Sequence, residues 1–451
     1  RSGSEPQRVN VEEDGLVNMP NVRGVRNMMI GTLAVAGVLA LAATATAADI
    51  EGSIGPDVVV FELPSTDYWG SNAGVAAYSV GTTSCNRGDE PLSWISSGNQ
   101  HPVIAQNLSR VTEPSAGPPV EHGKIEMLGI SWLKHGFLSV NGSQCDTCTQ
   151  PPLGGSQLGV GCSDPYGAGL NGSQSYLGPR FEVNAFTGEF IDNHSIPSGN
   201  PNLAGRINVK ESELINDPTA YSYFVEGHYI APDDAASDNA LNNASHREVT
   251  ISGSSLNTTG ATHEGIPAIY AWRDVDPSVT IREVTVPGEG LFIVAYKVGD
   301  NGDGTWRYQY SVFNLNSHLS GRSFSVPILP TSVVTGADFG DVDYHSGEPY
   351  DNTDWAFDAD PSSGWARWSS VDPVPPILPE NANALRWSTM YSFGFDADSP
   401  PEVALGTIGL FRSGGPSSVQ VIIEAPAGNL MPLFADDFET GDTGGWSGVF
   451  P

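Results

Sequence analysis

Residues 291–312 read LFIVAYKVGDNGDGTWRYQYSV, which is the pattern of a β-hairpin. Apolar and aromatic residues fill both arms, and a turn rich in Gly and Asp separates them. In the second arm Trp306, Tyr308, Tyr310 and Val312 alternate with other residues. Because side chains alternate between the two faces of a strand, we expect these four to share one face and to pack against a second layer.

Short strand-like runs recur along the rest of the chain, and helical periodicity is almost absent. Examples are VVVFEL at 58–63 and AAYSV at 76–80. The 52 Gly and 34 Pro residues among 451 supply frequent turns between such runs. We predict one short helix, at Asp233–Leu241. The pattern predicts an all-β fold of β-sandwich-like layers, with a disulfide-linked, loop-rich N-terminal region.

These patterns divide the chain into five segments. They are an upstream extension with a signal peptide (1–47), a Cys-containing loop-rich β region (48–205), a β-sandwich region (206–330), a second β-sandwich region packed with it (331–427) and a C-terminal tail (428–451).

The first segment has the order of features that defines an export signal. Arg23 and Arg26 precede an apolar run at 28–43, and residues 45–47 read Ala-Thr-Ala, the pattern that signal peptidase recognises. We expect cleavage after Ala47 and no membrane span in the mature chain, since the apolar run is shorter than the ~20 residues that a transmembrane helix needs. The sequence therefore predicts a secreted or cell-surface protein, with the periplasm as an alternative location.

The charge of the chain argues against nucleic acid as a partner. Lys and Arg total 20 and Asp and Glu total 52, for a formal net charge of -32. Nucleic-acid phosphates are contacted mainly by basic side chains, which are scarce here. The acidity indicates either a solvated surface that keeps an exported protein soluble or the binding of divalent cations.

Four cysteines, Cys85, Cys145, Cys148 and Cys162, lie in the first half of the chain. In an exported protein they predict two disulfides, and the spacing leaves all three pairings open. Cys145 and Cys148 also have the spacing of half a zinc knuckle. A zinc site would need a second close pair, which the sequence lacks.

Three other motifs match functional patterns but are weak predictors of function. Residues 167–172 match G-x-G-x-x-G, but we assign them to turns because no clear strand precedes them and no helix follows. Ser163, Asp164 and His135 could be combined into a catalytic triad, yet a chain with nine histidines permits many such choices. Residues 300–304 resemble the start of a calcium loop without its closing Glu, and a hairpin turn explains them better.

The densest group of potential ligands is the acidic segment, residues 341–355, which reads DVDYHSGEPYDNTDW. If its first part is a strand, alternate residues share one face and the later carboxylates can fold over them. Oxygen ligands favour calcium, whereas a histidine with two carboxylates also suits zinc, manganese or iron. The alternative is an exposed loop with turn-forming carboxylates. The candidate metal ligands are Asp341, Asp343, His345, Glu348, Asp351 and Asp354.

Six stretches of the chain read GTTSCN, SWLKHGF, LGVGCSDPY, LGPRFEVNAFTG, DVDYHSGEPYDNTDW and NANALRW. Together they resemble a family of exported bacterial proteins to which no activity is assigned. The resemblance covers about residues 58–411 and implies export and one integrated fold, but it identifies no catalytic residue. The C-terminal sequence FADDFETGD at 434–442 is similar to tails on many exported Gram-negative proteins, which implies sorting or surface display.

Taken alone, the sequence favours a binding or structural protein over an enzyme, because export, acidity, disulfides and the tail require no catalytic motif. Its ligand would be a glycan, an extracellular matrix or another protein, and calcium would stabilise the fold. The alternative is a secreted metal-dependent hydrolase or oxidase that uses Asp341, Asp343 and His345. We expect no other cofactor.

Overall fold

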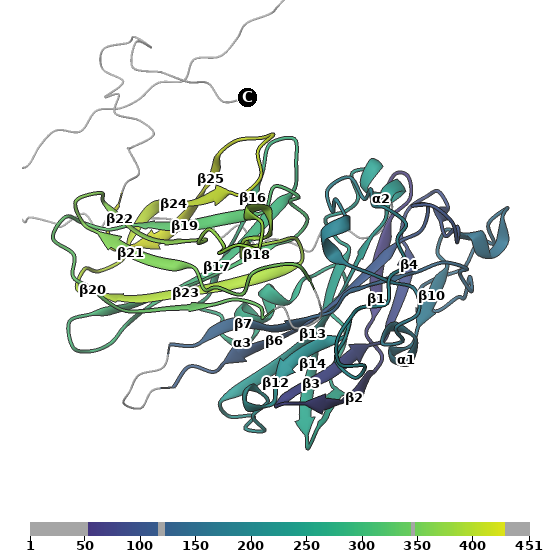
Figure 1. Ribbon diagram of the computed structural model, residues 1–451, viewed down its shortest axis with the longest axis horizontal. Coiled ribbons are helices and arrows are strands. Elements are labelled where there is room, and N and C mark those ends of the chain that lie inside the picture. The colour runs from purple at the N-terminus through teal and green to yellow at the C-terminus, as the bar shows by residue number, and fades with distance from the viewer. Residues whose placement is uncertain (1–52, 116–121, 344–347, 429–451) are drawn as a thin grey trace, which may run out of the picture. The chain divides into compact units, whose positions relative to one another are not determined.

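Figure 1 shows the computed structural model, which describes residues 53–115, 122–343 and 348–428. Strands dominate these ranges, and the α-helices within them have only four or five residues each. The all-β prediction is therefore confirmed. Within the same ranges, no helix is both long and apolar enough to cross a membrane. The predicted signal peptide (1–47) and nearly all of the predicted tail (428–451) lie outside the described residues.

The strands up to residue 258 form antiparallel sheets, the largest of which has the order β11-β8-β6-β13-β14-β15, with β7 also paired to β6. Smaller sheets have the orders β1-β4-β10, β12-β3-β2 and β5-β9. The strands are β1 (Val58–Glu62), β2 (Thr66–Asn72), β3 (Val75–Val80), β4 (Thr82–Asn86), β5 (Leu92–Ser93), β6 (Val103–Thr112), β7 (Lys124–Ile130), β8 (Leu133–His135), β9 (Gln157–Leu158), β10 (Ser163–Tyr166), β11 (Leu177–Gly178), β12 (Ile207–Lys210), β13 (Tyr221–Ile230), β14 (Ala244–Ser252) and β15 (Ser255–Thr258).

The later strands form two five-stranded antiparallel sheets, β16-β17-β18-β23-β20 and β21-β22-β19-β24-β25. Phe324 of the second sheet lies between Tyr310 and Phe393 of the first, with ring centroids 5.4 Å and 5.0 Å apart. The sheets thus pack face to face, as in a β-sandwich. Their strands are β16 (Thr280–Thr285), β17 (Leu291–Asp300), β18 (Trp306–Asn314), β19 (Gly321–Pro327), β20 (Val334–Gly340), β21 (Ala356–Asp360), β22 (Trp365–Ser369), β23 (Thr389–Ala397), β24 (Glu402–Leu410) and β25 (Ser418–Ala425).

The predicted hairpin at 291–312 is present as β17 and β18, with Val298 opposite Tyr308. In its turn, the Asp303 carboxylate accepts hydrogen bonds from the backbone N–H and the hydroxyl of Thr305, at 3.0 Å and 2.6 Å. Tyr308 and Tyr310 are buried in the sandwich core, as the alternation predicts. The carboxylates of this turn therefore have the local role expected of a hairpin rather than of a calcium loop.

Strand pairing crosses the boundaries suggested by the sequence at residues 205 and 330. β12 and β13 pair with β3 and β6 from the earlier part of the chain, and β23 pairs with β18. The core of the sandwich also continues into β7, where Ile125 and Met127 belong to the same buried cluster as Phe313. The described residues, 53–428 apart from the two gaps, belong to one compact unit.

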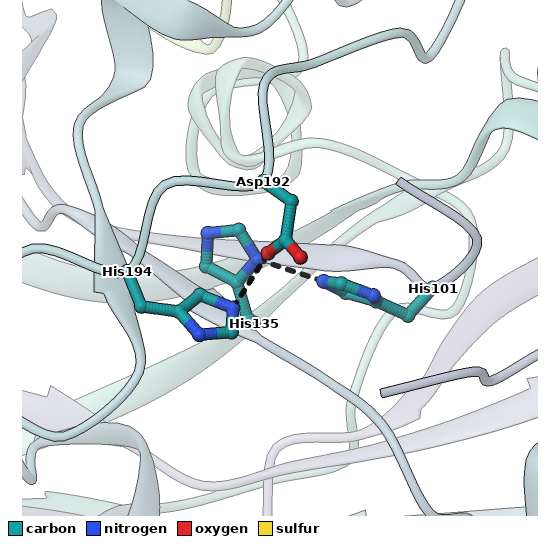
Figure 2. Close-up of side chains that lie close together, drawn as sticks. All are labelled: His101, His135, Asp192 and His194. Atoms are coloured by element: carbon teal, nitrogen blue, oxygen red, sulfur yellow. Dashed lines mark hydrogen bonds and ion pairs between the residues drawn. The ribbon is translucent and has the colours of Figure 1, made fainter. Parts of the chain in front are cut away.

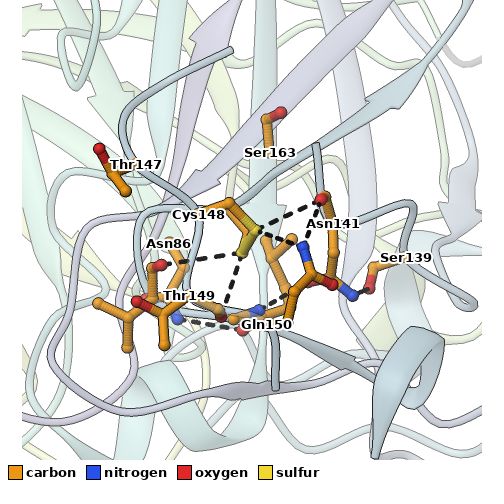
Figure 3. Close-up of a disulfide and its surroundings, with 12 residues drawn as sticks. Asn86, Ser139, Asn141, Thr147, Cys148, Thr149, Gln150 and Ser163 are labelled. Carbon is orange, nitrogen blue, oxygen red and sulfur yellow. Dashed lines mark hydrogen bonds between the residues drawn. A yellow bond between two sulfur atoms is a disulfide. The ribbon is translucent and has the colours of Figure 1, made fainter. Parts of the chain in front are cut away.

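Both predicted disulfides are present, and the structure supplies the pairing that the sequence left open. Cys85 of β4 is joined to Cys145, and Cys148 is joined to Cys162. Because the sulfurs of all four cysteines are bonded in pairs, none is a free thiolate that could bind zinc, which excludes the zinc-knuckle alternative. Figure 3 shows the second bridge beside Asn141, whose side-chain carbonyl accepts the Gly159 N–H at 2.8 Å and so ties the loop ends together.

The α-helices differ from expectation in two places. The helix predicted at 233–241 is shorter, because α2 (Pro232–Ala236) ends before Asp238, which adopts a positive φ of 60°. The segment at 167–172 does follow a strand and open a helix, which the sequence interpretation denied, but this helix, α1 (Ala168–Asn171), has a single turn. The third helix is α3 (Ala271–Val275), and short 3-10 turns lie at Gly154–Ser156, Arg180–Glu182, Glu211–Glu213, Ala268–Tyr270 and Pro379–Asn381.

Candidate metal centre

Two histidines meet because β6 and β8 are neighbours in the largest sheet. His135 is the last residue of β8 and lies opposite Val103, the first residue of β6. His101 precedes Val103 by two residues, and the Gly136 N–H donates to the Pro102 carbonyl at 2.9 Å. The strand register therefore brings both imidazoles to the same end of this strand pair.

A loop from the next strand brings two more ligands to the same place. Ser195 forms a β-bridge with Leu177 of β11, and its N–H donates to the Leu177 carbonyl at 2.8 Å. Because β11 pairs with β8, this bridge holds the preceding residues beside His135. Figure 2 shows Asp192 and His194 on this loop, with their side chains directed toward His101 and His135.

We call these residues the histidine centre: His101, His135, Asp192 and His194. His101 Nε2 lies 2.8 Å from His135 Nδ1, and His194 Nε2 lies 2.8 Å from Asp192 Oδ1. One donor atom from each residue lies within 4.8 Å of all the others. Ligand atoms around tetrahedral zinc are roughly 3.4 Å apart, as the ~2.05 Å bonds require. Small side-chain movements would bring the four atoms to such a geometry.

A hydrogen bond outside the centre fixes the tautomer of His101. Its Nδ1 lies 2.8 Å from the Ile95 carbonyl, which can only accept, so Nδ1 carries the proton. The lone pair of His101 is therefore on Nε2, which faces the other ligands. Metal-binding histidines are commonly oriented in this way by a carbonyl on the opposite ring nitrogen.

Burial keeps the two sheet histidines neutral. Burial, followed by charge repulsion from the neighbouring His101, His194 and Lys134, lowers the pKa of His135 to about 3. Burial also lowers the pKa of His101. A neutral imidazole can offer a lone pair to a metal ion. His101 Nε2 does so directly, whereas His135 Nδ1 donates its proton to His101 Nε2 and would have to lose that proton before it could bind an ion.

Aromatic rings contact the histidines of the centre, one of them buried and one exposed. Phe190 contacts His101 and His135 edge-on, with ring centroids 5.3 Å and 5.4 Å apart. Tyr176 contacts His194 edge-on at 5.2 Å. By contrast with Phe190, the side chains of Asp192 and His194 are partly exposed, at 24% and 26%. An ion could therefore enter from the solvent and be bound against a low-dielectric wall.

The donor set determines which ions suit the centre. Three imidazoles and one carboxylate fit zinc, iron, copper, nickel or manganese. Calcium instead takes six to eight oxygen ligands, which these residues do not supply.

The acidic segment is arranged differently from the strand that the sequence suggested. β20 ends at Gly340, and neither Asp341 nor Asp343 belongs to a strand. Asp341 accepts a hydrogen bond from the Asn383 side chain, and burial raises its pKa to about 6. Asp343 forms an ion pair of 2.5 Å with Lys210. The first two carboxylates thus have partners from other parts of the chain.

The remaining candidate ligands of the acidic segment are dispersed. Glu348 is buried and accepts the Arg180 N–H at 3.1 Å, whereas Asp351 is half-buried and Asp354 exposed. His345 lies outside the described residues. Among those that are described, no group of three metal-ligand atoms within 4.8 Å includes a residue of this segment. The calcium hypothesis stays a prediction.

The triad that the sequence permits is not assembled. Asp164 accepts hydrogen bonds from the Trp94 indole N–H at 3.1 Å and the Val140 N–H at 2.7 Å. His135 instead contacts His101. Sequence reasoning singles out His135 but not its partners, because the four residues of the centre come from three separate segments. The only local signal was the short Asp-x-His spacing at 192–194.

No family model matches the chain, and no curated protein sequence matches it either. The resemblance to exported bacterial proteins therefore stays a prediction. The function has to be argued from the geometry of the centre.

Proposed function

We propose that this is an extracytoplasmic β-rich binding or structural protein that holds a transition-metal ion at the histidine centre. The observation that carries the proposal is the convergence of His101, His135, Asp192 and His194, whose donor atoms all lie within 4.8 Å of one another. Two disulfides support a location outside the cytoplasm, where thiols are oxidised.

The metal would connect an exposed loop to a rigid sheet. His101 and His135 are buried beside β6 and β8, while Asp192 and His194 belong to the exposed loop. An ion shared by the two pairs would fix the loop in one conformation and so present a defined surface. Such a surface suits a glycan, matrix or protein ligand, and the net charge of -32 argues against nucleic acid.

One observation favours a metal-dependent enzyme as the second candidate. The exposed side of the centre would leave a bound ion accessible to water or to a substrate atom. A metal ion in such a position polarises a substrate carbonyl or lowers the pKa of bound water. The hydrolase or oxidase hypothesis would then apply to the histidine centre and not to the acidic segment.

The experiment is a titration of the purified, disulfide-bonded protein with Zn²⁺ by calorimetry, with Ca²⁺ present in excess to occupy weak carboxylate sites. The variant Asp192→Asn with His194→Ala removes two exposed ligands without opening a cavity in the core. We expect it to weaken Zn²⁺ binding at this centre by at least roughly 100-fold. The control is Glu189→Gln, which changes an exposed carboxylate three residues before Asp192 that is not part of the centre. Equal Zn²⁺ affinity and stoichiometry in all three proteins would overturn the proposal.

The acidic segment has its own test. If it binds calcium, Ca²⁺ raises the melting temperature by mass action, and Asp341→Asn with Asp343→Asn removes that rise. A melting curve that is the same with calcium and with chelator would refute the calcium hypothesis. That result would leave the histidine centre unaffected.

A further inference from the structure

A second histidine on the largest sheet has an unused lone pair in the interior. His246 of β14 is 1% exposed, and its Nδ1 lies 2.8 Å from the Ile266 carbonyl. Nδ1 therefore carries the proton, and the lone pair is on Nε2. Among the described residues, this Nε2 is buried and has no hydrogen-bond partner. A buried polar atom without a partner costs about 1–3 kcal/mol, and such an atom calls for an explanation.

Two further potential ligands lie beside His246. His263 forms a β-bridge with His246, and its N–H donates to the His246 carbonyl at 2.8 Å. The two rings stack with centroids 4.4 Å apart. Asp274 of α3 is also close, because its Oδ2 lies 3.6 Å from His263 Nδ1. One donor atom from each of the three residues lies within 4.8 Å of the others.

We propose that His246, His263 and Asp274 form a second site for a divalent transition-metal ion. Two imidazoles and one carboxylate are a ligand set used for zinc and for non-haem iron, with water or substrate in the remaining positions. The metal would give the buried Nε2 of His246 the partner that it lacks. The three residues share no ligand with the histidine centre.

The site combines a fixed ligand with two adjustable ones. His246 is held by its bond to Ile266 and by Phe224, whose ring contacts it edge-on at 5.7 Å. The side chains of His263 and Asp274 are 44% and 47% exposed. Because the rings of His246 and His263 are nearly parallel, His263 would have to turn to direct its lone pair at the ion, and its exposure permits this. Three protein ligands would leave coordination positions open on the solvent side.

The experiment measures metal stoichiometry in the full, disulfide-bonded protein. The metal-free protein is loaded with Zn²⁺ or Co²⁺ against a competing chelator, and bound metal is counted by elemental analysis. The visible spectrum of Co²⁺ reports coordination by nitrogen ligands. We expect two equivalents in the wild type and one in the variant His263→Ala with Asp274→Asn. The control is Glu248→Gln, an exposed carboxylate on the same strand, which should retain both equivalents.

Each outcome separates this inference from the proposed function. If the wild type binds one ion and only Asp192→Asn with His194→Ala removes it, the second site is refuted and the histidine centre stands. If the one ion is removed only by His263→Ala with Asp274→Asn, the second site stands and the histidine centre is refuted. Two equivalents in the His263 and Asp274 variant would also overturn the inference.

Discussion

The acidic segment and the histidine centre show opposite relations between sequence and space. Six potential ligands crowd into residues 341–354, yet the described members are dispersed among separate partners. The histidine centre draws on residues 101–194, and its members are adjacent only in the fold. A high density of ligands along the chain thus does not imply that their donor atoms converge.

The physical reason lies in what each carboxylate contacts. Asp341 accepts a hydrogen bond from the side chain of Asn383, and Asp343 forms an ion pair with Lys210. Glu348 accepts a hydrogen bond from the backbone N–H of Arg180. Consecutive carboxylates repel one another, so partners elsewhere in the chain stabilise them separately. Neutral histidines do not repel in this way, and strand register can bring them together.

The largest expected effect is on metal binding when an interior ligand is removed. His135→Ala should weaken Zn²⁺ binding at the histidine centre by at least roughly 100-fold, because the loss of a supporting residue alone costs 10–100-fold. Asp354→Asn, an exposed change in the acidic segment, should alter the affinity by less than about twofold. Calorimetric titration measures both, and circular dichroism verifies that the variants are folded. Comparable losses in the two variants would erase the contrast between the regions.

A smaller effect is expected from the buried member of the acidic segment. Burial raises the pKa of Glu348 from 4.5 to about 7. Between these two pH values the folded chain keeps the Glu348 proton, whereas the unfolded chain has lost it. This group therefore contributes stability below pH 4.5, and the contribution is lost as the pH rises to about 7. Glu348→Gln keeps the carbonyl that accepts the Arg180 N–H but cannot ionise.

We expect the stability of Glu348→Gln relative to the wild type to increase by roughly 2–3 kcal/mol between pH 4.5 and pH 8. Urea unfolding at the two pH values measures this difference, and Asp354→Asn serves as the exposed control. A relative stability that does not change with pH would show that Glu348 is not held neutral by burial.

The smallest effect concerns the exposed ion pair of the acidic segment. Asp343→Asn removes the pair with Lys210, whose side chain is 48% exposed. Because water screens such pairs, we expect a loss of no more than about 0.5 kcal/mol. Thermal unfolding of the two single variants and of the double variant with Lys210→Gln measures the coupling. A coupling several times larger would mean that this segment contributes to the fold as strongly as a buried network.

The sequence predicts the fold well where the signal is local. The hairpin at 291–312 follows from alternation and turn chemistry, and its core tyrosines are buried as expected. The presence of two disulfides follows from the cysteine count. Their pairing depends on long-range contacts: Ser163 pairs with Cys85 and is bridged to Gly142, which brings the chain before Cys145 close to β4. The helix predicted at 233–241 is too long because the positive φ at Asp238 has no clear sequence signal.

The histidine centre could be predicted only in part. The sequence offers His135 only as a possible member of a triad with Ser163 and Asp164, which many other histidines would fit equally well. Its contact with His101 depends on the register between β6 and β8, and its contact with His194 depends on the bridge between Leu177 and Ser195. These contacts are set by backbone hydrogen bonds that any residue can form, so the side-chain sequence carries little trace of them.

The bond between Cys148 and Cys162 affects what happens when a protease cuts the loop that it closes. It encloses residues 149–161, which include the exposed Leu153. A peptidase that cut the chain there would add one water molecule and release no fragment, because both new ends would remain covalently connected through the bridge. Cys145, bonded to Cys85, adds a second connection on the upstream side. The protein could thus be nicked at this surface loop and keep every residue until a reductant reached it.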